Sequence, residues 1–305
     1  MDKKKRSVSE KRDRMLGFVT AMPAMILLFV FTVYPVFYLI YYSMFSGSLI
    51  SAKKTFVGLD NYKELFGSET FRMVLVNTVV YTVLFVSLTM VLAVIIAVWL
   101  NGSKHKKLNN MVEGFIFTPH VISMVSVSIV FKALFNPEGG PVNSLLMALG
   151  ISNPPGWFMD IHWSMTSIVI LTVWHTVGYY MVILLAGLQN INTELYEAAA
   201  IDGANARQRY FRITLPMLTP SLFFIMIMSM INSLKVFDQV SVATQGGPGT
   251  SSFVLVYAIY DYAFNRFEMG YASAIAWVLL VIILLFTMLV FKSSALWTYY
   301  EEERK

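Results

Sequence analysis

Long apolar stretches alternate with short polar segments along the whole chain. Six of the apolar stretches meet the length of about 20 residues that carries a helix across a bilayer. They lie at about residues 16–42, 73–100, 114–135, 164–188, 217–240 and 273–291. A spanning chain must satisfy its own backbone hydrogen bonds, which favours helices. The pattern therefore predicts an all-α integral membrane protein with six transmembrane helices in residues 16–291, flanked by tails at 1–15 and 292–305.

The lysines and arginines between these stretches predict which way the chain is oriented. The two tails and the segments 101–113 and 189–216 hold sixteen of them, and the alternate segments 43–72, 136–163 and 241–272 hold five. Lysine and arginine accumulate on the cytoplasmic side of membrane proteins. Both termini and the loop at 189–216 are therefore expected in the cytoplasm.

Composition supports the membrane class and excludes others. The chain is 57% hydrophobic and 13% charged, against roughly a quarter charged in soluble domains, and its mean hydropathy is +0.63. The net charge of +5 comes from basic residues beside apolar runs, which indicates topology and not a nucleic-acid surface. Without cysteine the chain forms no disulfide and no thiolate metal site. A basic start followed by about 30 mostly apolar residues is too long for a signal peptide and predicts an uncleaved first span.

The loop at 189–216 contains the longest polar segment on the expected cytoplasmic side. An alanine run at 198–200 favours a helix, which Asn192 or Thr193 can cap. Gly203 is suited to ending that helix, because glycine readily adopts the left-handed conformation. A second helical run is expected to end at Leu215–Pro216. The sequence predicts a helix, a turn and a second helix against the membrane face.

The spacing in this loop resembles a family signature. Glu-Ala-Ala, Gly203, then isoleucine, leucine and proline at 213, 215 and 216 are similar to the signature loop of binding-protein-dependent ABC importer permeases. The resemblance implies that the loop carries a coupling helix, which docks into a cleft of a separate ATPase subunit. The residues that match the signature or lie within it are Glu197, Ala198, Ala199, Asp202, Gly203, Ile213, Leu215 and Pro216. The alternative interpretation is a solvated helix-turn-helix between two spans.

Two further phrases resemble the carbohydrate-uptake, maltose-type (MalF-like) branch of that family. They are FVGLDNYKELF at 56–66 and TQGGPGTSS at 244–252, and the likeness extends from about Phe56 to Phe291. It implies a type I ABC importer transmembrane domain, with both termini inside, in the bacterial cytoplasmic (inner) membrane. It also implies a second permease subunit in a heterodimer, two ATPase subunits, an extracellular solute-binding protein and a carbohydrate substrate.

No nucleotide site is expected in this chain. A phosphate-binding loop needs GxxxxGK[ST], and no lysine follows Gly246, Gly247 and Gly249 in that register. ATP-Mg is therefore expected on the partner subunits, with no cofactor here, and the glycine loop is interpreted as a structural or docking turn. Four scattered histidines provide neither a nucleophile with its base nor a metal cluster, so an enzyme is not expected.

Polar residues at helical spacing in the fourth and fifth spans predict a substrate pathway. Such groups are costly in a membrane and usually face an interior or a wet path. The candidates are Thr172, His175, Thr176, Tyr179, Ser229, Asn232, Ser233 and Val236. In maltose-type relatives the residues that contact sugar resemble these positions. The alternatives are that hydroxyls only bond carbonyls or join helices, and that His175 is a proton relay. Asp238, near the outer end of its span, is expected to pair with Lys235 or to meet the binding protein.

The preferred function is a permease subunit of an ATP-driven importer that moves a carbohydrate by alternating access. A hydroxyl-bearing face without arginine in the spans favours a neutral sugar. The alternative is an ion-coupled secondary carrier of a neutral solute, which commonly holds carboxylates within its spans. Glu113 and Asp238 lie only at span ends. Neither the sugar nor the partner permease can be inferred from the sequence.

Overall fold

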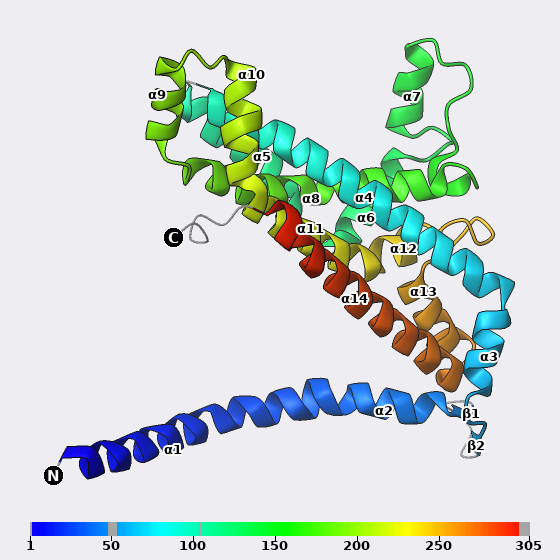
Figure 1. The fold of residues 1–305 in the computed structure, drawn as a ribbon. Coiled ribbons are helices and arrows are strands. Elements are labelled where there is room, and N and C mark those ends of the chain that lie inside the picture. The colour runs from blue at the N-terminus through cyan, green and yellow to red at the C-terminus, as the bar shows by residue number, and fades with distance from the viewer. Residues whose placement is uncertain (1, 48–53, 104, 299–305) are drawn as a thin grey trace. The chain divides into compact units, whose positions relative to one another are not determined.

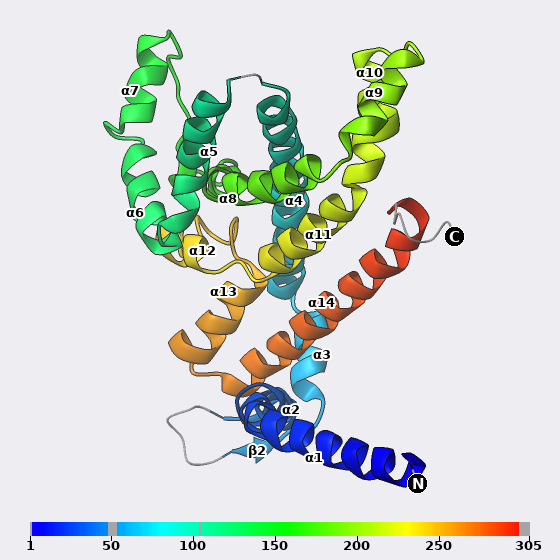
Figure 2. The same cartoon turned by 90° about the vertical axis from the view of Figure 1, so that its left-hand side faces the viewer.

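Residues 2–47, 54–103 and 105–298 are described by a computed structural model, and most of them are helical (Figures 1 and 2). The chain divides into two compact units. The first is Met1–Leu65 with Tyr262–Trp277, and the second is Phe66–Asp261 with Val278–Lys305.

The first unit contains a long helix and a small hairpin. Its elements are α1 (Asp2–Leu28), a π-helical turn (Phe29–Val33), α2 (Tyr34–Ser43), β1 (Phe45–Ser46), antiparallel β2 (Thr55–Phe56), most of α3 (Asp60–Gly67), part of a second π-helical turn (Asp261–Asn265) and the start of α14 (Met269–Trp297). The π-helical turn after α1 ends two residues before Pro35, which has no N–H for the helical ladder. The apolar helix Asp13–Ser43 is long enough to span, and its most apolar window buries none of its residues inside the chain.

Residues 56–66 hold the end of this first span in place through side-chain hydrogen bonds. Gly58 has a positive φ of 57° and turns the chain into α3. Asn61 Nδ2 donates to the Ser43 carbonyl at 2.7 Å and to the Phe45 carbonyl at 3.1 Å. The Tyr62 hydroxyl lies 2.7 Å from Ser43 Oγ. The bond to Ser43 satisfies a carbonyl that the end of α2 leaves without a helical partner. The other two bonds hold β1 and the end of α2 against α3.

The second unit contains the packed core. Its elements are α4 (Glu69–Gly102), α5 (Lys106–Val121), α6 (Met124–Leu134), α7 (Pro141–Ala148), a 3₁₀ turn (Trp157–Met159), α8 (Ser164–Gln189), α9 (Thr193–Ile201), α10 (Ala206–Arg209), a π-helical turn (Tyr210–Thr214), α11 (Leu215–Leu234), α12 (Asp238–Ala243), α13 (Leu255–Tyr260) and the rest of α14 from Val278. Helix α8 packs along α4 and α5. The approach to α5 requires Gly178, since a Cβ there would lie 2.1 Å from the Ile116 carbonyl oxygen. Tyr81, Tyr180 and Leu184 are fully buried in this core.

The described residues include five helices long and apolar enough to span a membrane, or six if one bent pair counts as a single span. That pair is α5 and α6, which form an angle of 99° within the predicted third span. A continuous helix at 114–135 was therefore wrong. Pro119 removes a ladder donor near the end of α5, Ile122 is extended, and the Ser123 side chain caps α6 by accepting from the Ser126 N–H.

The fifth span also differs from the prediction, at both ends. The helical run expected to end at Leu215–Pro216 continues instead from α10 through the π-helical turn into α11. The longer π-helical spacing precedes Pro216, and Thr219 Oγ1 donates to the Pro216 carbonyl at 2.6 Å, where Pro220 has no N–H to offer. At the other end α11 stops at Leu234, and residues 235–237 separate it from α12.

Candidate functional site

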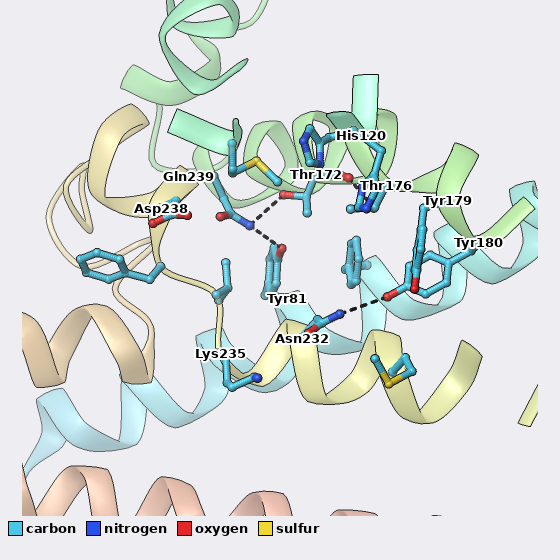
Figure 3. Close-up of a pocket in the computed structure, with 16 residues that line it drawn as sticks. Tyr81, His120, Thr172, Thr176, Tyr179, Tyr180, Asn232, Lys235, Asp238 and Gln239 are labelled. Atoms are coloured by element: carbon cyan, nitrogen blue, oxygen red, sulfur yellow. Dashed lines mark hydrogen bonds between the residues drawn. The ribbon is translucent and has the colours of Figure 1, made fainter. Parts of the chain in front are cut away.

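A cavity of about 470 Å³ lies in the second unit, where the two broken spans meet α4 and α8 (Figure 3). Its walls combine hydroxyl, amide, imidazole and aromatic groups with two charged side chains. The lining residues are Tyr81, Phe85, His120, Met124, Thr172, His175, Thr176, Tyr179, Tyr180, Met228, Asn232, Lys235, Val236, Phe237, Asp238 and Gln239. Residues 235–237 line this space directly, and His120 of α5 and Met124 of α6 line it from either side of the other break.

Six of the eight residues predicted for the pathway line this cavity: Thr172, His175, Thr176, Tyr179, Asn232 and Val236. Ser229 and Ser233 do not line it. Their hydroxyls donate to carbonyls of their own helix, at Met226 (3.1 Å) and Met230 (2.7 Å). Val236 also lines the cavity, but not as part of the predicted helical face, because it lies beyond the end of α11.

A buried amide joins three elements at one wall. Gln239 Nε2 of α12 donates to the Tyr81 hydroxyl of α4 at 3.1 Å and to Thr172 Oγ1 of α8 at 3.2 Å (Figure 3). Thr172 in turn donates to the Ile168 carbonyl. Sequence analysis missed Gln239 and Tyr81, because both lie outside the two helical faces that it considered.

Two histidines meet beside the bend between α5 and α6. His175 Nε2 lies 2.9 Å from the Ile122 carbonyl oxygen. A carbonyl only accepts, so this nitrogen carries the proton in the neutral ring. The His120 ring stacks on Tyr179 with centroids 4.6 Å apart and lies 5.3 Å from the His175 ring. Nδ1 of each histidine is buried and has no hydrogen-bond partner among the residues that the structure describes. The contact of His175 with Ile122 fixes the bend against α8.

Lys235 and Asp238 bring opposite charges to the cavity. The expected ion pair between them does not form: among the described residues, no lysine nitrogen lies within 4.0 Å of the Asp238 carboxylate. On a continuous helix this spacing would place them on one face. The break at residues 235–237 separates them, and Figure 3 shows Asp238 beside Gln239, with Lys235 apart from both. Both charges therefore remain available to a ligand.

The signature loop forms a rigid elbow of α9 and α10. Asn192, not Thr193, caps α9 by accepting from the Glu194 N–H at 3.0 Å. At its other end Gly203 has φ +78°, and the N–H groups of Gly203 and Ala204 donate to the carbonyls of Ala200 and Ala199. This is a Schellman C-cap.

A capping box and a cross-link complete the elbow. The Asn205 side chain accepts from the Gln208 N–H, and the Gln208 side chain accepts from the Asn205 N–H. The Tyr196 hydroxyl lies 2.9 Å from Thr214 Oγ1 and so ties α9 to the start of the fifth span. Sequence analysis missed both pairs.

The predicted coupling residues divide into two groups in the structure. Glu197, Ala198, Asp202 and Gly203 are exposed, whereas Ala199, Ile213, Leu215 and Pro216 are half-buried. The most prominent apolar side chain of the elbow was not among those predicted. Ile201, in the last turn of α9, is 87% exposed. The elbow thus presents an apolar tip beside the acids Glu197 and Asp202.

The glycine loop at 244–252 is held firmly in the second unit. Gly246 and Gly249 have φ of +80° and +58°, and Ser252 Oγ donates to the Gly247 carbonyl. Asn77 Nδ2 of α4 donates to the carbonyls of Thr250 at 2.7 Å and Phe253 at 3.1 Å. Asn77, left unassigned from the sequence, is an anchor for this loop.

Replacing Asn77 with leucine is expected to loosen the loop. Two carbonyls would lose their donor, at about 1–1.5 kcal/mol each, so amides in 244–254 should exchange with deuterium about tenfold faster. Val76→Leu, at an exposed neighbouring position, is the matched control. Equal exchange in the two variants would show that Asn77 is not the anchor.

Comparison with known proteins agrees with this architecture. The chain belongs to the family described as binding-protein-dependent transport system inner membrane component, whose model matches residues 89–295. It is thus a permease subunit of an inner-membrane transport system and not an enzyme.

Two relatives match over nearly the whole chain. The Bacillus subtilis (strain 168) protein named Probable ABC transporter permease protein YesP is 37% identical over 100% of this chain and 98% of its own length. The lactose transport system permease LacF of Rhizobium radiobacter is 35% identical over 91% and 93%.

Solved structures show the same fold. A chain of a bacterial alginate ABC transporter, solved with an alginate-bound periplasmic protein, has a TM-score of 0.83 at 24% identity, covering 93% of this chain and 95% of its own. A chain of the MetNI methionine ABC transporter has a TM-score of 0.56 at 16% identity, covering 76% and 100%. The fold is that of a type I ABC importer transmembrane domain.

Proposed function

We propose that this permease moves a carbohydrate, and that the sugar passes through the cavity at the two helix breaks. The single observation that carries the proposal is that cavity. In membrane transporters, interrupted helices commonly border the substrate site. Here hydroxyls of Tyr81, Thr176 and Tyr180, the amide of Asn232 and the aromatic faces of Tyr179 and Phe237 surround it. Sugars need donors and acceptors together with apolar surfaces.

The relatives support this substrate class. LacF is named for lactose transport, and a Bacillus subtilis relative, 34% identical over 91% of this chain, for arabinooligosaccharide transport. A Thermococcus litoralis relative, 32% identical over 96%, is named for trehalose and maltose. These names belong to proteins that match this chain over nearly its whole length, so we propose that it also moves a carbohydrate.

The elbow is proposed as the contact with the ATPase. Its exposed tip is apolar at Ile201 and acidic at Glu197 and Asp202, and the Tyr196–Thr214 bond joins it to the fifth span, which borders the cavity. Two ATPase subunits would hold ATP-Mg, and their closure would move the elbow and that span together. Ligand binding biases such a change only if its affinity differs between the two states.

A second permease is proposed to complete the pathway. The residues that line the cavity all come from one unit of this chain, so they would form one side of a passage. The assembly would then contain two permeases in a heterodimer, two ATPase subunits and an extracellular solute-binding protein.

Reconstituted vesicles test the proposal. The complete complex, with binding protein and oligosaccharide on the outside, should take up sugar only with ATP inside. A calorimetric screen of the purified binding protein against neutral and acidic oligosaccharides identifies the ligand. Uptake that an uncoupler abolishes while ATP is maintained would replace this function with an ion-coupled carrier. A binding protein that recognises an amino acid and no sugar would contradict the substrate class.

A further inference from the structure

A second hollow, of about 330 Å³, lies in the same unit, apart from the central cavity. Three chain segments form it: the end of α6 with the residues after it, the 3₁₀ turn, and the end of α12 with the glycine loop. We call it the outer hollow. Its lining includes Lys132, Phe135, Phe158, Met159, Ala243 and Pro248.

The outer hollow lies at the opposite end of the fold from the elbow. The chain enters α8 at Ser164, whose hydroxyl lies 2.7 Å from that of Ser251 in the glycine loop, and it leaves α8 for the elbow (Figure 1). The fifth span likewise begins at the elbow and ends at Ala243. If the elbow faces the cytoplasm, as the lysine and arginine count predicts, the outer hollow faces outward.

The floor of the hollow is apolar and its walls are fixed. Phe135, Phe158 and Ala243 are 7%, 5% and 5% exposed, and the two phenylalanine rings lie 5.6 Å apart. The glycine loop that forms one wall is anchored by Asn77. A preformed site loses little conformational entropy when it binds a partner.

Lys132 is a positively charged residue in the lining of this apolar hollow. Lys132 is exposed, and no carboxylate among the described residues lies within 4.0 Å of its ammonium group. Glu138 and Asp160, on the neighbouring segments, make no ion pair with it, and Asp160 Oδ1 instead accepts from the His162 N–H. The side chain of Met159, 66% exposed, adds an apolar contact. A positive charge beside apolar surface suits an acidic side chain, whose carboxylate is attached through methylene groups.

We propose that the outer hollow is the docking site for an acidic side chain of the extracellular solute-binding protein, with Lys132 as its ion-pair partner. The inference rests on the proposed function, because it requires such a partner. Docking there would place the binding protein on the glycine loop, which leads from the fifth span that borders the cavity to α13.

Charge reversal at Lys132 is the direct test. In the complete complex in lipid nanodiscs, ATPase rate is measured against the concentration of ligand-loaded binding protein. Lys132→Glu should raise the half-saturating concentration about tenfold or more, since like charges repel, with unchanged basal and maximal rates. Lys132→Arg should stay near wild type. Lys63→Glu makes the same charge change on an exposed helix of the same predicted side and should have little effect.

A contact map gives a second readout that does not depend on affinity. The chain has no cysteine, so Met159→Cys provides a unique site for a photo-crosslinker. It should crosslink to the binding protein, whereas Val83→Cys, exposed on α4 within a span, should not.

The outcomes separate the two claims. A wild-type complex that binding protein does not stimulate would contradict the proposed function itself. Stimulation with the same half-saturation in Lys132→Glu and wild type, or an equal shift in Lys63→Glu, would overturn only the docking site. An effect confined to the basal or maximal rate would instead indicate that Lys132 meets lipid or the second permease, and would also overturn it.

Discussion

Replacing Ile201 with aspartate should detach the permease from its ATPase subunit. The isoleucine side chain is 87% exposed at the end of α9, and docking of α9 into a cleft of the ATPase subunit would bury it. An aspartate there would carry an unpaired charge into the contact, costing about 3 kcal/mol or more, equivalent to a loss of affinity of about 100-fold. Copurification of the ATPase with the tagged permease, and ATPase rate in nanodiscs, measure the effect.

Two variants control for the change itself. Ile201→Val keeps the apolar surface and should copurify normally. Leu296→Asp makes the same kind of substitution at a side chain that is 88% exposed but outside the elbow. An Ile201→Asp permease that retains the ATPase at the wild-type ratio would contradict the coupling role of α9.

A bulky side chain in the central cavity should stop sugar uptake without stopping ATP hydrolysis by the ATPase subunits. Thr176 lines the cavity and its hydroxyl only donates to the Thr172 carbonyl of its own helix, at 2.6 Å. Thr176→Trp removes no bond between helices and occupies the space a ligand needs. Sugar uptake is expected to fall about 100-fold, because a close-packed protein interior cannot shift enough to hold both the indole ring and a sugar. ATPase stimulation by loaded binding protein should persist, since the elbow is unaltered.

The matched control lies on the same helix. Ile170→Trp adds the same ring to α8 at a side chain that is 38% exposed and does not line the cavity, so uptake should continue. Thr176→Ala should also transport. Wild-type uptake by Thr176→Trp would mean that the sugar takes another path.

Several structural features followed from local sequence. The turn at Gly58, the helix at residues 60–67, the α9 helix and its end at Gly203 depend on propensities and caps within a few residues, which can be read directly from the chain. Six of the eight residues predicted for the pathway line the cavity, and five of these six are polar groups in apolar runs, which are costly wherever they lie.

Other features could not be read in this way. The break at residues 235–237 contains neither proline nor glycine, so no local signal indicated it. Ser229 and Ser233 share the polar spacing of Asn232, yet their hydroxyls donate to carbonyls of their own helix, whereas the Asn232 amide donates to the Tyr180 hydroxyl of α8. The exposure of Ile201 depends on which surfaces the rest of the fold leaves uncovered.

By itself, then, the sequence determined the membrane class, the expected orientation and the signature elbow, because hydropathy, charge count and capping are properties of short segments. Only the tertiary structure decided what faces the cavity. It brought Tyr81, Gln239 and the two histidines together from different helices, and it separated Lys235 from Asp238 by interrupting the fifth span. Contacts between residues distant in the chain depend on how the helices pack, and periodicity within one helix carries no information about that.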